Sequence, residues 1–435
     1  MKILQINTAD FGGGAEGSAY KLFEMYRQLG HQSVLAVGTK YRDDADIVEI
    51  PRLPSGGLLR NVAFYASGIA RKLDKCSFPG CRKMARILAR MSSPLRCQQY
   101  RDGLEETDFP GCHRLLEALP FTPDIVHIHN MHGWYFDIGM LPQLSAKFPT
   151  ILNLRDTWAL TGHCAYFMDC EKWRTGCGNC PRLDVYPALR KDGTAQNWRN
   201  KADIYAASRL YVCAPSKWLI DCAKASMLKA AEYKVIPNGI DTTVFTPGDK
   251  ALARRSLDLP VDVPIVMFAS AAAKTVFKDQ DTLRNAVEEI AQRRPDVHFL
   301  CVGSEPGVNV PNMHNLAYIS SPSKMADCYR AADVFLHTAK AEAFGKTVTE
   351  AMACGTPAVA SGVGGLLEQI VPGETGFLAF SQEEHVFQVL RYLELQPEEH
   401  KKMEELSAKR GASFSLERQA NSFLEWYGEL LASNK

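Results

Sequence analysis

The sequence lacks long hydrophobic runs, and it carries almost no net charge. No segment reaches the roughly 18 consecutive apolar residues that a membrane-spanning helix needs. The formal net charge is +1, so bulk electrostatics give no reason to expect a nucleic-acid partner. Internal repeats and low-complexity tracts are absent too, which argues against a repeat architecture. Residues 1–7 lack the apolar region of a signal peptide and are expected to form the first strand.

Length and composition limit the class of protein. The 435 residues exceed one ordinary hydrophobic core and fit two domains of about 200 residues each. A hydrophobic share of 46% and a charged share of 23% are typical of a soluble globular protein. Because no export signal is predicted, we expect a cytoplasmic protein. Its 13 cysteines are then mostly thiols or metal ligands and seldom form disulfides.

The stretch at residues 341–360, AEAFGKTVTEAMACGTPAVA, carries the clearest functional signal. Residues 347–352 contain no helix breaker, whereas Gly355 and Pro357 stop a helix. Residues 358–360 then predict a short buried strand. The pattern therefore predicts a loop, a helix and a strand in succession.

Two glutamates flank the start of this predicted helix. Unpaired backbone N–H groups and the helix dipole favour an anion at Phe344, Gly345 and Lys346. Glu342 precedes the helix, and Glu350 follows near the end of the first turn. This arrangement suits a ligand with phosphates at the helix start and hydroxyls on both sides. A nucleotide sugar has that layout.

A second glycine-rich turn follows the first strand. Residues 8–16, TADFGGGAE, lead into a helix in which apolar residues recur from Ala19 to Leu29 on one face. A strand, a glycine turn and a helix in this order let the backbone approach a diphosphate. A plain tight turn is the alternative interpretation.

The glutamate motif resembles the donor-binding signature of retaining glycosyltransferases of family 4, which have the GT-B fold. The resemblance is carried by the Glu-x7-Glu spacing with Phe-Gly between, by Glu-Ala-Met-Ala-Cys-Gly-Thr-Pro, and by Gly364-Gly365. The glycine loop and the connector IPNGID at residues 236–241 are similar to other segments of this family. The resemblance covers nearly the whole chain outside residues 45–105.

The resemblance implies an α/β architecture with two Rossmann-like domains facing each other across a cleft. We expect residues 1–215 to form an acceptor-side domain, with a basic insertion at 55–100 and a cysteine-rich loop at 163–181. Residues 216–415 are expected to bind the nucleotide sugar. Residues 416–435 are expected to form a terminal helix that crosses back to the first domain.

The resemblance also implies roles for individual residues. Relatives place an arginine about six residues before Lys278, but Ala272 stands there, and Lys274 is expected to substitute. The expected catalytic residues are Glu342, Lys278 and Arg155. The expected donor-binding residues are Gly13, Gly14, Lys274, Lys278, Phe344, Gly345, Lys346, Thr347 and Glu350.

Polar residues also follow two predicted strands of the first half. The segments at residues 127–133, HIHNMHG, and 155–158, RDTW, come at carboxyl strand ends, where open α/β sheets bind ligands. They resemble family segments that face the acceptor and the donor sugar, although relatives usually have histidine where this chain has Arg155. His127 is interpreted as a core residue. The expected acceptor-side residues are His129, Asn130, His132 and Asp156.

Four cysteines follow in the spacing C-x5-C-x6-C-x2-C, with His163 next to the first. The closing C-x2-C is a good half-site for tetrahedral zinc, but the leading C-x5-C is looser than standard. A structural zinc, a disulfide and free thiols all stay open. The candidate zinc ligands are Cys164, Cys170, Cys177 and Cys180.

The insertion at 55–100 is strongly basic in a nearly neutral protein. Nine lysines and arginines face one aspartate there, interleaved with apolar residues. One interpretation is a helical insertion with a solvated basic face. The other is a surface that meets anionic lipid headgroups or a lipid-diphosphate acceptor. The basic residues are Arg60, Arg71, Lys72, Lys75, Arg82, Lys83, Arg86, Arg90 and Arg96.

By resemblance, the protein is a retaining hexosyltransferase that moves a sugar from a UDP- or GDP-sugar to a glycan or lipid-linked acceptor. Cell-surface polysaccharide biosynthesis at the inner face of the membrane is the expected setting. The family's scheme uses no protein nucleophile, and the donor phosphate takes the acceptor proton. It demands no metal cofactor. A sugar-nucleotide epimerase and a non-catalytic nucleotide-sugar-binding scaffold are the alternatives.

Overall fold

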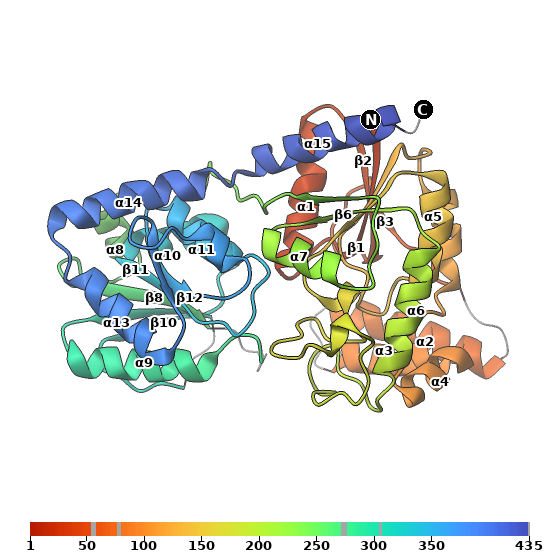
Figure 1. The fold of residues 1–435 in the computed structure, drawn as a ribbon, viewed down its shortest axis with the longest axis horizontal. Coiled ribbons are helices and arrows are strands. Elements are labelled where there is room, and N and C mark those ends of the chain that lie inside the picture. The colour runs from red at the N-terminus through yellow and green to blue at the C-terminus, as the bar shows by residue number, and fades with distance from the viewer. Residues whose placement is uncertain (54–57, 76–79, 271–275, 304–306, 434–435) are drawn as a thin grey trace. The chain divides into compact units, whose positions relative to one another are not determined.

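The structure is a computed structural model that describes residues 1–53, 58–75, 80–270, 276–303 and 307–433 (Figure 1). The chain divides into two compact units. The first contains Met1–Ala214, Ile220–Lys234 and Leu424–Lys435, and the second contains Pro215–Leu219 and Val235–Phe423. This division differs from the predicted boundaries at 215/216 and 415/416, because the chain passes between the units more than once.

A seven-stranded sheet in the order β3-β2-β1-β4-β5-β6-β7 forms the centre of the first unit. The pairings from β3 through to β6 are parallel. β6 is followed in this sheet by β7, which forms its edge. The strands are β1 Lys2–Ala9, β2 Gln32–Thr39, β3 Ile47–Glu49, β4 Ile125–Ile128, β5 Thr150–Asn153, β6 Leu210–Ala214 and β7 Glu232–Val235.

Helices cover this sheet, and the predicted insertion is helical. Phe23 of the first helix packs on Leu35 and Val37 of β2, which is the amphipathic packing that its periodicity predicts. The helices are α1 Gly14–Gln28, α2 Leu58–Lys75, α3 Cys81–Met91, α4 Pro94–Asp102, α5 Leu141–Lys147, α6 Thr194–Ala206 and α7 Lys217–Ala225. The 3-10 turns are η1 Pro110–Ala118, η2 Ile138–Met140, η3 Trp158–Leu160 and η4 Lys172–Arg174.

A six-stranded sheet in the order β10-β9-β8-β11-β12-β13 forms the second unit, and its pairings are parallel. Its strands are β8 Ile265–Ser270, β9 His298–Gly303, β10 Met313–Leu316, β11 Val334–His337, β12 Ala358–Ser361 and β13 Gly376–Ala379. Its helices are α8 Lys250–Ser256, α9 Gln280–Arg293, α10 Pro322–Ala331, α11 Lys346–Ala353, α12 Leu366–Gln369, α13 Gln382–Leu393 and α14 Pro397–Ala412.

Two apolar layers enclose this second sheet. Residues of α8, α10 and α11 form one layer, and residues of α9 and α13 form the other. The inner strands β8, β9, β11 and β12 are mostly buried, which explains why they are largely continuous apolar runs rather than alternating ones.

The terminal helix α15 (Leu416–Ser433) contributes its last turns to the first unit. The Tyr427 hydroxyl lies 2.6 Å from Nδ1 of His127 and 3.0 Å from the Tyr26 hydroxyl, all three side chains being buried. Burial lowers the pKa of His127 well below its ordinary value, and Arg155 adds to this effect. His127 is therefore a core residue, as its sequence context predicts.

Both sheets reverse their strand order at one point, between β1 and β4 in the first unit and between β8 and β11 in the second. Ligands of open α/β sheets bind outside the carboxyl ends of the strands at such a switch point. The loops after these four strands are therefore where a site is expected. Among the described helices, none is long and apolar enough to cross a membrane.

Candidate functional site

In the second unit, the loops after β8 and β11 bring a lysine and a glutamate together. Nζ of Lys278 lies 2.7 Å from Oε2 of Glu342, although the residues are 64 positions apart. The lysine side chain is 42% exposed and that of the glutamate 16%, so the lysine can reach solvent and a ligand. Two of the residues expected to be catalytic therefore meet at the switch point of this sheet.

Hydrogen bonds between the same two loops fix the position of Lys278. The Lys340 amide donates to the Phe277 carbonyl at 2.9 Å, and the Thr338 hydroxyl donates to the Asp279 carbonyl at 2.8 Å. Asp279 in turn caps α9. The backbone on both sides of Lys278 is thus tied to the strand end that carries Glu342.

The electrostatics keep Glu342 ionised. Burial alone would raise the pKa of this carboxyl, but the charge and hydrogen bond of Lys278, together with the Phe344 amide, outweigh it and hold the pKa below its ordinary value. His337 ends β11, and its Nε2 lies 4.0 Å from Glu342 Oε2. Burial, with Lys278 adding to it, lowers the pKa of His337 to about 3, so this imidazole is neutral at pH 7. Sequence reasoning did not select His337, although its strand-end position could have done so.

Helix α11 begins at Lys346 and Gly345 is its N-cap, within the predicted helix entry at residues 344–346. Gly345 has φ of +83°, and a Cβ there would lie 2.4 Å from Cδ2 of Leu366. No other residue fits this conformation and this space without strain. Glycine is also required at positions 364 and 365, because a Cβ on either residue would lie within 2.2 Å of a carbonyl oxygen of residues 342–343. The glycines of the motif therefore let the loop after β12 pack against the loop that carries Glu342.

Glu350 lies on α11 behind its first turn, with a side chain only 12% exposed. The Tyr329 hydroxyl donates to its Oε2 at 3.3 Å, and Lys346 Nζ lies 3.8 Å from its Oε1. Burial raises the pKa of Glu350, and these two neighbours only partly offset that effect. Lys346 and Thr347 are half-buried in the first turn, so their side chains and amides stand close to the same helix start.

Phe344 and Lys274 are two further residues that the sequence predicts to bind the donor. The Phe344 side chain is buried and packs edge-on against Phe414 at 5.6 Å between ring centroids, so only its backbone is available to a ligand. Lys274 lies outside the described residues.

In the first unit, the glycine loop after β1 leads directly into α1. Gly13 precedes the helix, and no side chain caps the helix start. A Cβ on Gly14 would meet nothing within 4 Å, so the space beside this amide is open. Gly12 has φ of +140°, a conformation that L side chains rarely adopt. Anion binding by the amides of this loop stays a prediction.

The residues after β4 and β5 form a buried polar chain. His129 is 2% exposed, with Nε2 2.7 Å from Gln5 Oε1 and Nδ1 2.9 Å from Nη2 of Arg155. Burial lowers the pKa of Arg155 to about 10, although Cys213, Tyr26 and Glu16 oppose that change. The carbonyl of Asn130 accepts a hydrogen bond from Tyr135. The contact with His129 therefore orients the Arg155 guanidinium, and His129 itself is buried.

His132 and Asp156 form a hydrogen-bonded pair. His132 Nε2 lies 2.9 Å from Oδ2 of Asp156, and its Nδ1 lies 3.3 Å from the Tyr186 hydroxyl. The other Asp156 oxygen accepts from the Trp158 amide at 2.9 Å. The structure thus brings these two predicted residues together, and it adds Tyr186, which lies 54 positions away and gave no sequence signal.

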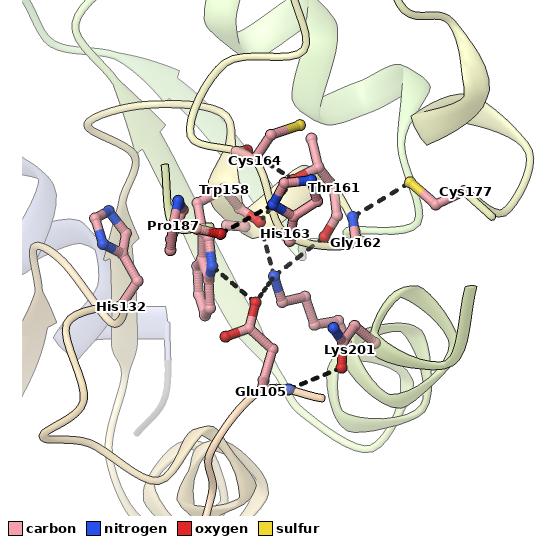
Figure 2. Close-up of polar contacts among 12 residues, drawn as sticks. Glu105, His132, Trp158, Thr161, Gly162, His163, Cys164, Cys177, Pro187 and Lys201 are labelled. Atoms are coloured by element: carbon pink, nitrogen blue, oxygen red, sulfur yellow. Dashed lines mark hydrogen bonds and ion pairs between the residues drawn. The ribbon is translucent and has the colours of Figure 1, made fainter. Parts of the chain in front are cut away.

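A buried lysine holds the turn beside this pair (Figure 2). Lys201 is fully buried, and its Nζ donates to the Trp158 and Thr161 carbonyls at 2.9 and 3.1 Å. The same amine lies 3.5 Å from the centroid of the Trp158 ring and 3.4 Å from Oε1 of Glu105. The Trp158 indole also donates to Glu105 Oε1, at 2.9 Å. Glu105 and Lys201 thereby join three segments, and neither was predicted.

The cysteine-rich loop follows this turn. The cysteines at 164, 170, 177 and 180 are free, so they form no disulfide. Cys180 Sγ lies 3.4 Å from Nε2 of His163, and Cys177 Sγ accepts from the Gly162 amide at 3.3 Å. Within the described residues, no three His, Cys, Asp or Glu side chains are placed to hold a metal ion.

This arrangement lends the zinc hypothesis no support, and zinc binding stays a prediction. Elemental analysis of protein purified without added metal would confirm it by finding about one zinc per chain.

The chain is similar to known proteins in part of its sequence and in its fold. Residues 249–410 match the family model described as Glycosyl transferases group 1. The fold is GT-B, which confirms the predicted fold class. The structure of Anabaena Alr3699/HepE, solved in complex with UDP and glucose, superimposes with a TM-score of 0.63 at 17% identity, covering 99% of this chain and 100% of that one.

Two curated relatives are similar in sequence. A D-inositol 3-phosphate glycosyltransferase of Acidothermus cellulolyticus is 30% identical over 200 residues, which are 41% of this chain and 44% of the relative. The match thus spans less than half of that relative's length. A putative colanic acid biosynthesis glycosyl transferase of Escherichia coli, WcaC, is 21% identical over 99% of this chain and 100% of its own.

Proposed function

We propose that this protein transfers a sugar from a nucleoside diphosphate sugar to a hydroxyl of a glycan or lipid-linked acceptor, with retention of anomeric configuration. The observation that carries the proposal is the Lys278–Glu342 pair beside the start of α11. The UDP and glucose bound by the Anabaena protein support a UDP-sugar as the first donor to test. The name of the Escherichia coli relative supports a role in polysaccharide biosynthesis.

The chemistry to be supplied is departure of a nucleoside diphosphate from the anomeric carbon. Negative charge grows on the leaving oxygen, so cations and preorganised N–H groups aimed at that oxygen lower the barrier most. Lys278 and the amides of residues 345–347 supply such groups in the second unit. The amide of Gly14, beside which the space is open, is the corresponding group of the first, with that of Gly13 next to it.

The two glutamates would have different roles. Glu342 stays ionised beside Lys278, so it can accept hydrogen bonds from the sugar hydroxyls while the lysine turns to the diphosphate. Glu350 lies deeper along α11 and would accept hydrogen bonds from the ribose. No side chain is required as a nucleophile in this scheme, because the departing phosphate takes the acceptor proton.

A product assay tests the proposal against its rivals. Incubation with a UDP-sugar and an acceptor mixture gives a new glycoside if the protein is a transferase. An epimerase gives a changed sugar and needs no acceptor, whereas a binding scaffold gives no product. Glu342→Ala should lower turnover by about 100-fold or more and leave UDP affinity within about threefold.

Glu350→Ala should instead weaken UDP binding by about tenfold, the loss expected for one hydrogen bond to a charged group. Glu405→Ala, on the exposed face of α14 in the same unit, is the matched control and should change neither property. Wild-type turnover in both active-site variants would contradict the site assignment.

We further propose that α2 and α3 dock the protein on an anionic membrane. Their outer faces carry exposed apolar side chains, including Tyr65 at 64%, Ile69 at 61% and Met91 at 61%. Arg60, Lys72 and Lys83 are exposed on the same two helices. Apolar side chains beside basic ones are the composition of a helix that lies in a lipid interface.

Vesicle sedimentation tests this docking. Each basic residue near an anionic surface contributes about 1 kcal/mol, so three engaged side chains give reversible binding. Binding must weaken with salt, because the Debye length falls from about 10 Å at 0.1 M to about 3 Å at 1 M. Equal binding to neutral and anionic vesicles, or none to either at low salt, would contradict the proposal. The transferase assignment does not depend on this result.

A further inference from the structure

A pocket of ≈ 390 Å³ lies in the first unit, between the glycine loop after β1 and the insertion helices α2 to α4. Gly12 and Gly13 form part of its wall, and Arg71, Arg86 and Trp134 form another part. Its volume falls within the range of small-molecule sites. Because the glycine loop is one of its walls, a ligand in this pocket can reach the switch point of the first sheet.

The pocket carries more positive than negative side chains. Five arginines line it, against three carboxylates. Arg90 Nε lies 2.5 Å from Oε1 of Glu106, and Arg96 stacks on Phe109 at 5.1 Å. These contacts fix two of the arginines as parts of the wall. The excess positive charge inside a recess favours an anionic ligand.

Arg71 and Arg86 reach the pocket from two different helices. On α2, Phe64, Ser67 and Arg71 line the pocket at helical spacing, whereas Tyr65 and Ile69 are exposed on the other face. Helix α3 has the same division, with Arg86 lining the pocket and Ile87 exposed. Each helix therefore has an inner face for a ligand and an outer face for solvent or lipid.

An aromatic surface stands beside Arg86. Its guanidinium lies 4.8 Å from the centroid of the Trp134 ring, and Tyr186 meets the same ring edge-on at 6.5 Å. Trp134 has φ of +62°, a conformation that is costly for a bulky residue and that functional sites retain when the surroundings impose it. An aromatic face next to a guanidinium fits a sugar ring that carries an anionic group.

We propose that this pocket binds the acceptor as a phosphate or diphosphate ester, with the phosphoryl group on Arg71 and Arg86 and the sugar ring against Trp134. Guanidinium groups present paired donors that match phosphate oxygens, so two from different helices can hold one phosphoryl group. This inference rests on the proposed function, because it assumes that the ligand is an acceptor. A lipid-linked sugar diphosphate and a free sugar phosphate share this chemistry.

Arginine footprinting tests the site without any turnover. Phenylglyoxal labelling of the wild-type chain, read by peptide mass spectrometry, is compared with inorganic pyrophosphate, glucose 1-phosphate, geranyl diphosphate or methyl glucoside present. Arg71 and Arg86 should label at least about threefold more slowly with either ester. Arg60, exposed on α2 outside the pocket, is the internal control and should not change.

The probes distinguish a lipid-linked acceptor from a free sugar phosphate, and they include outcomes that would overturn the proposal. Stronger protection by geranyl diphosphate assigns a lipid-linked acceptor, and stronger protection by glucose 1-phosphate assigns a free sugar phosphate. Protection by neither ester, equal slowing at Arg60, or equal protection by neutral methyl glucoside would overturn the proposal. A transferase with an uncharged acceptor would still pass the product assay, so the two failures are distinguishable.

A matched pair of double variants gives a second test. Arg71→Gln with Arg86→Gln should weaken binding of the protecting ester by about tenfold or more. Lys72→Gln with Lys83→Gln makes the same charge change on the same helices, but these lysines are exposed and outside the pocket. This control should keep ester binding within about twofold. Equal losses in both would mean that only net charge matters, which overturns the site.

Discussion

Lys201 offers a test of the buried network in Figure 2. Lys201→Met removes the ammonium and keeps most of the aliphatic stem, so the change is mainly electrostatic. The ammonium interacts with the carbonyls of Trp158 and Thr161, the Trp158 ring and Glu105. Burial lowers the pKa of Lys201, and Glu105 only partly restores it, so the folded protein already bears a cost for this charge.

The expected loss in the free energy of unfolding depends on the groups that lose their partner in Lys201→Met. Removing one partner of a fully buried ion pair costs about 3–5 kcal/mol. The Glu105 side chain is 21% exposed and keeps its bond from the Trp158 indole, so the lower end applies. We expect a loss of about 3 kcal/mol, from the lost hydrogen bonds to the Thr161 and Trp158 carbonyls and from the buried Glu105 carboxylate left without its cation. For a domain of 150–250 residues this is a fall in Tm of about 6–12 °C.

Urea unfolding at pH 7, followed by near-UV circular dichroism and by tryptophan fluorescence, measures this loss. Lys191→Met is the matched control, because Lys191 is 66% exposed and its ion pair with Asp102 is on the surface. That control should lose less than about 1 kcal/mol. A loss below about 1 kcal/mol in Lys201→Met would refute the reasoning, since the network would then be replaceable by apolar packing.

Two further predictions concern α11. Gly345→Ala combines left-handed backbone strain with the contact to Leu366 and should cost about 2–4 kcal/mol in urea unfolding. Gly373→Ala has the same kind of φ but open space around its Cβ, and it should cost only about 1 kcal/mol. Equal losses would contradict the packing argument. UDP binding should weaken as pH falls from 7 towards 5, because Glu350, with its raised pKa, takes up a proton at a higher pH than an ordinary glutamate. Glu350→Gln should bind UDP weakly and should lose this pH dependence. Identical pH profiles of UDP affinity for the variant and the wild type, measured by calorimetry, would exclude Glu350 as the source of the pH dependence.

The local parts of the site were predictable because they follow from neighbouring residues. The bounds of α11 depend on Gly345, Gly355 and Pro357, each of which acts within its own turn. Lys278 and Glu342 were each selected through family resemblance, but their contact was not predicted, because 64 residues separate the two. Strand β7 was missed for a physical reason: Glu232, Tyr233 and Lys234 are polar and partly exposed, so they carry no apolar run.

The residues that pack from a distance were not predictable. A lysine such as Lys201 on a polar helix predicts a solvated face, and only the fold shows that it is buried. Tyr186 and His132 meet because two loops converge. Neither loop has a periodicity or a residue spacing from which this contact could be predicted. The cysteine spacing suggested a ligand set, yet spacing says nothing about the direction of the side chains, and those described do not form a metal site.

The insertion helices α2 and α3 were predictable only in part. Their periodicity is visible in the sequence, but the residues that they pack against are not. Arg71 and Lys72 are adjacent, and adjacent helical residues point about 100° apart. One therefore faces the pocket and the other is exposed. If the two faces have separate functions, Lys72→Gln with Lys83→Gln should reduce binding to anionic vesicles by about 30-fold, while Arg71→Gln with Arg86→Gln should reduce it by less than about threefold. Sedimentation at 0.1 M salt measures both, and equal losses would mean that vesicle binding follows net charge and that the two faces do not act separately.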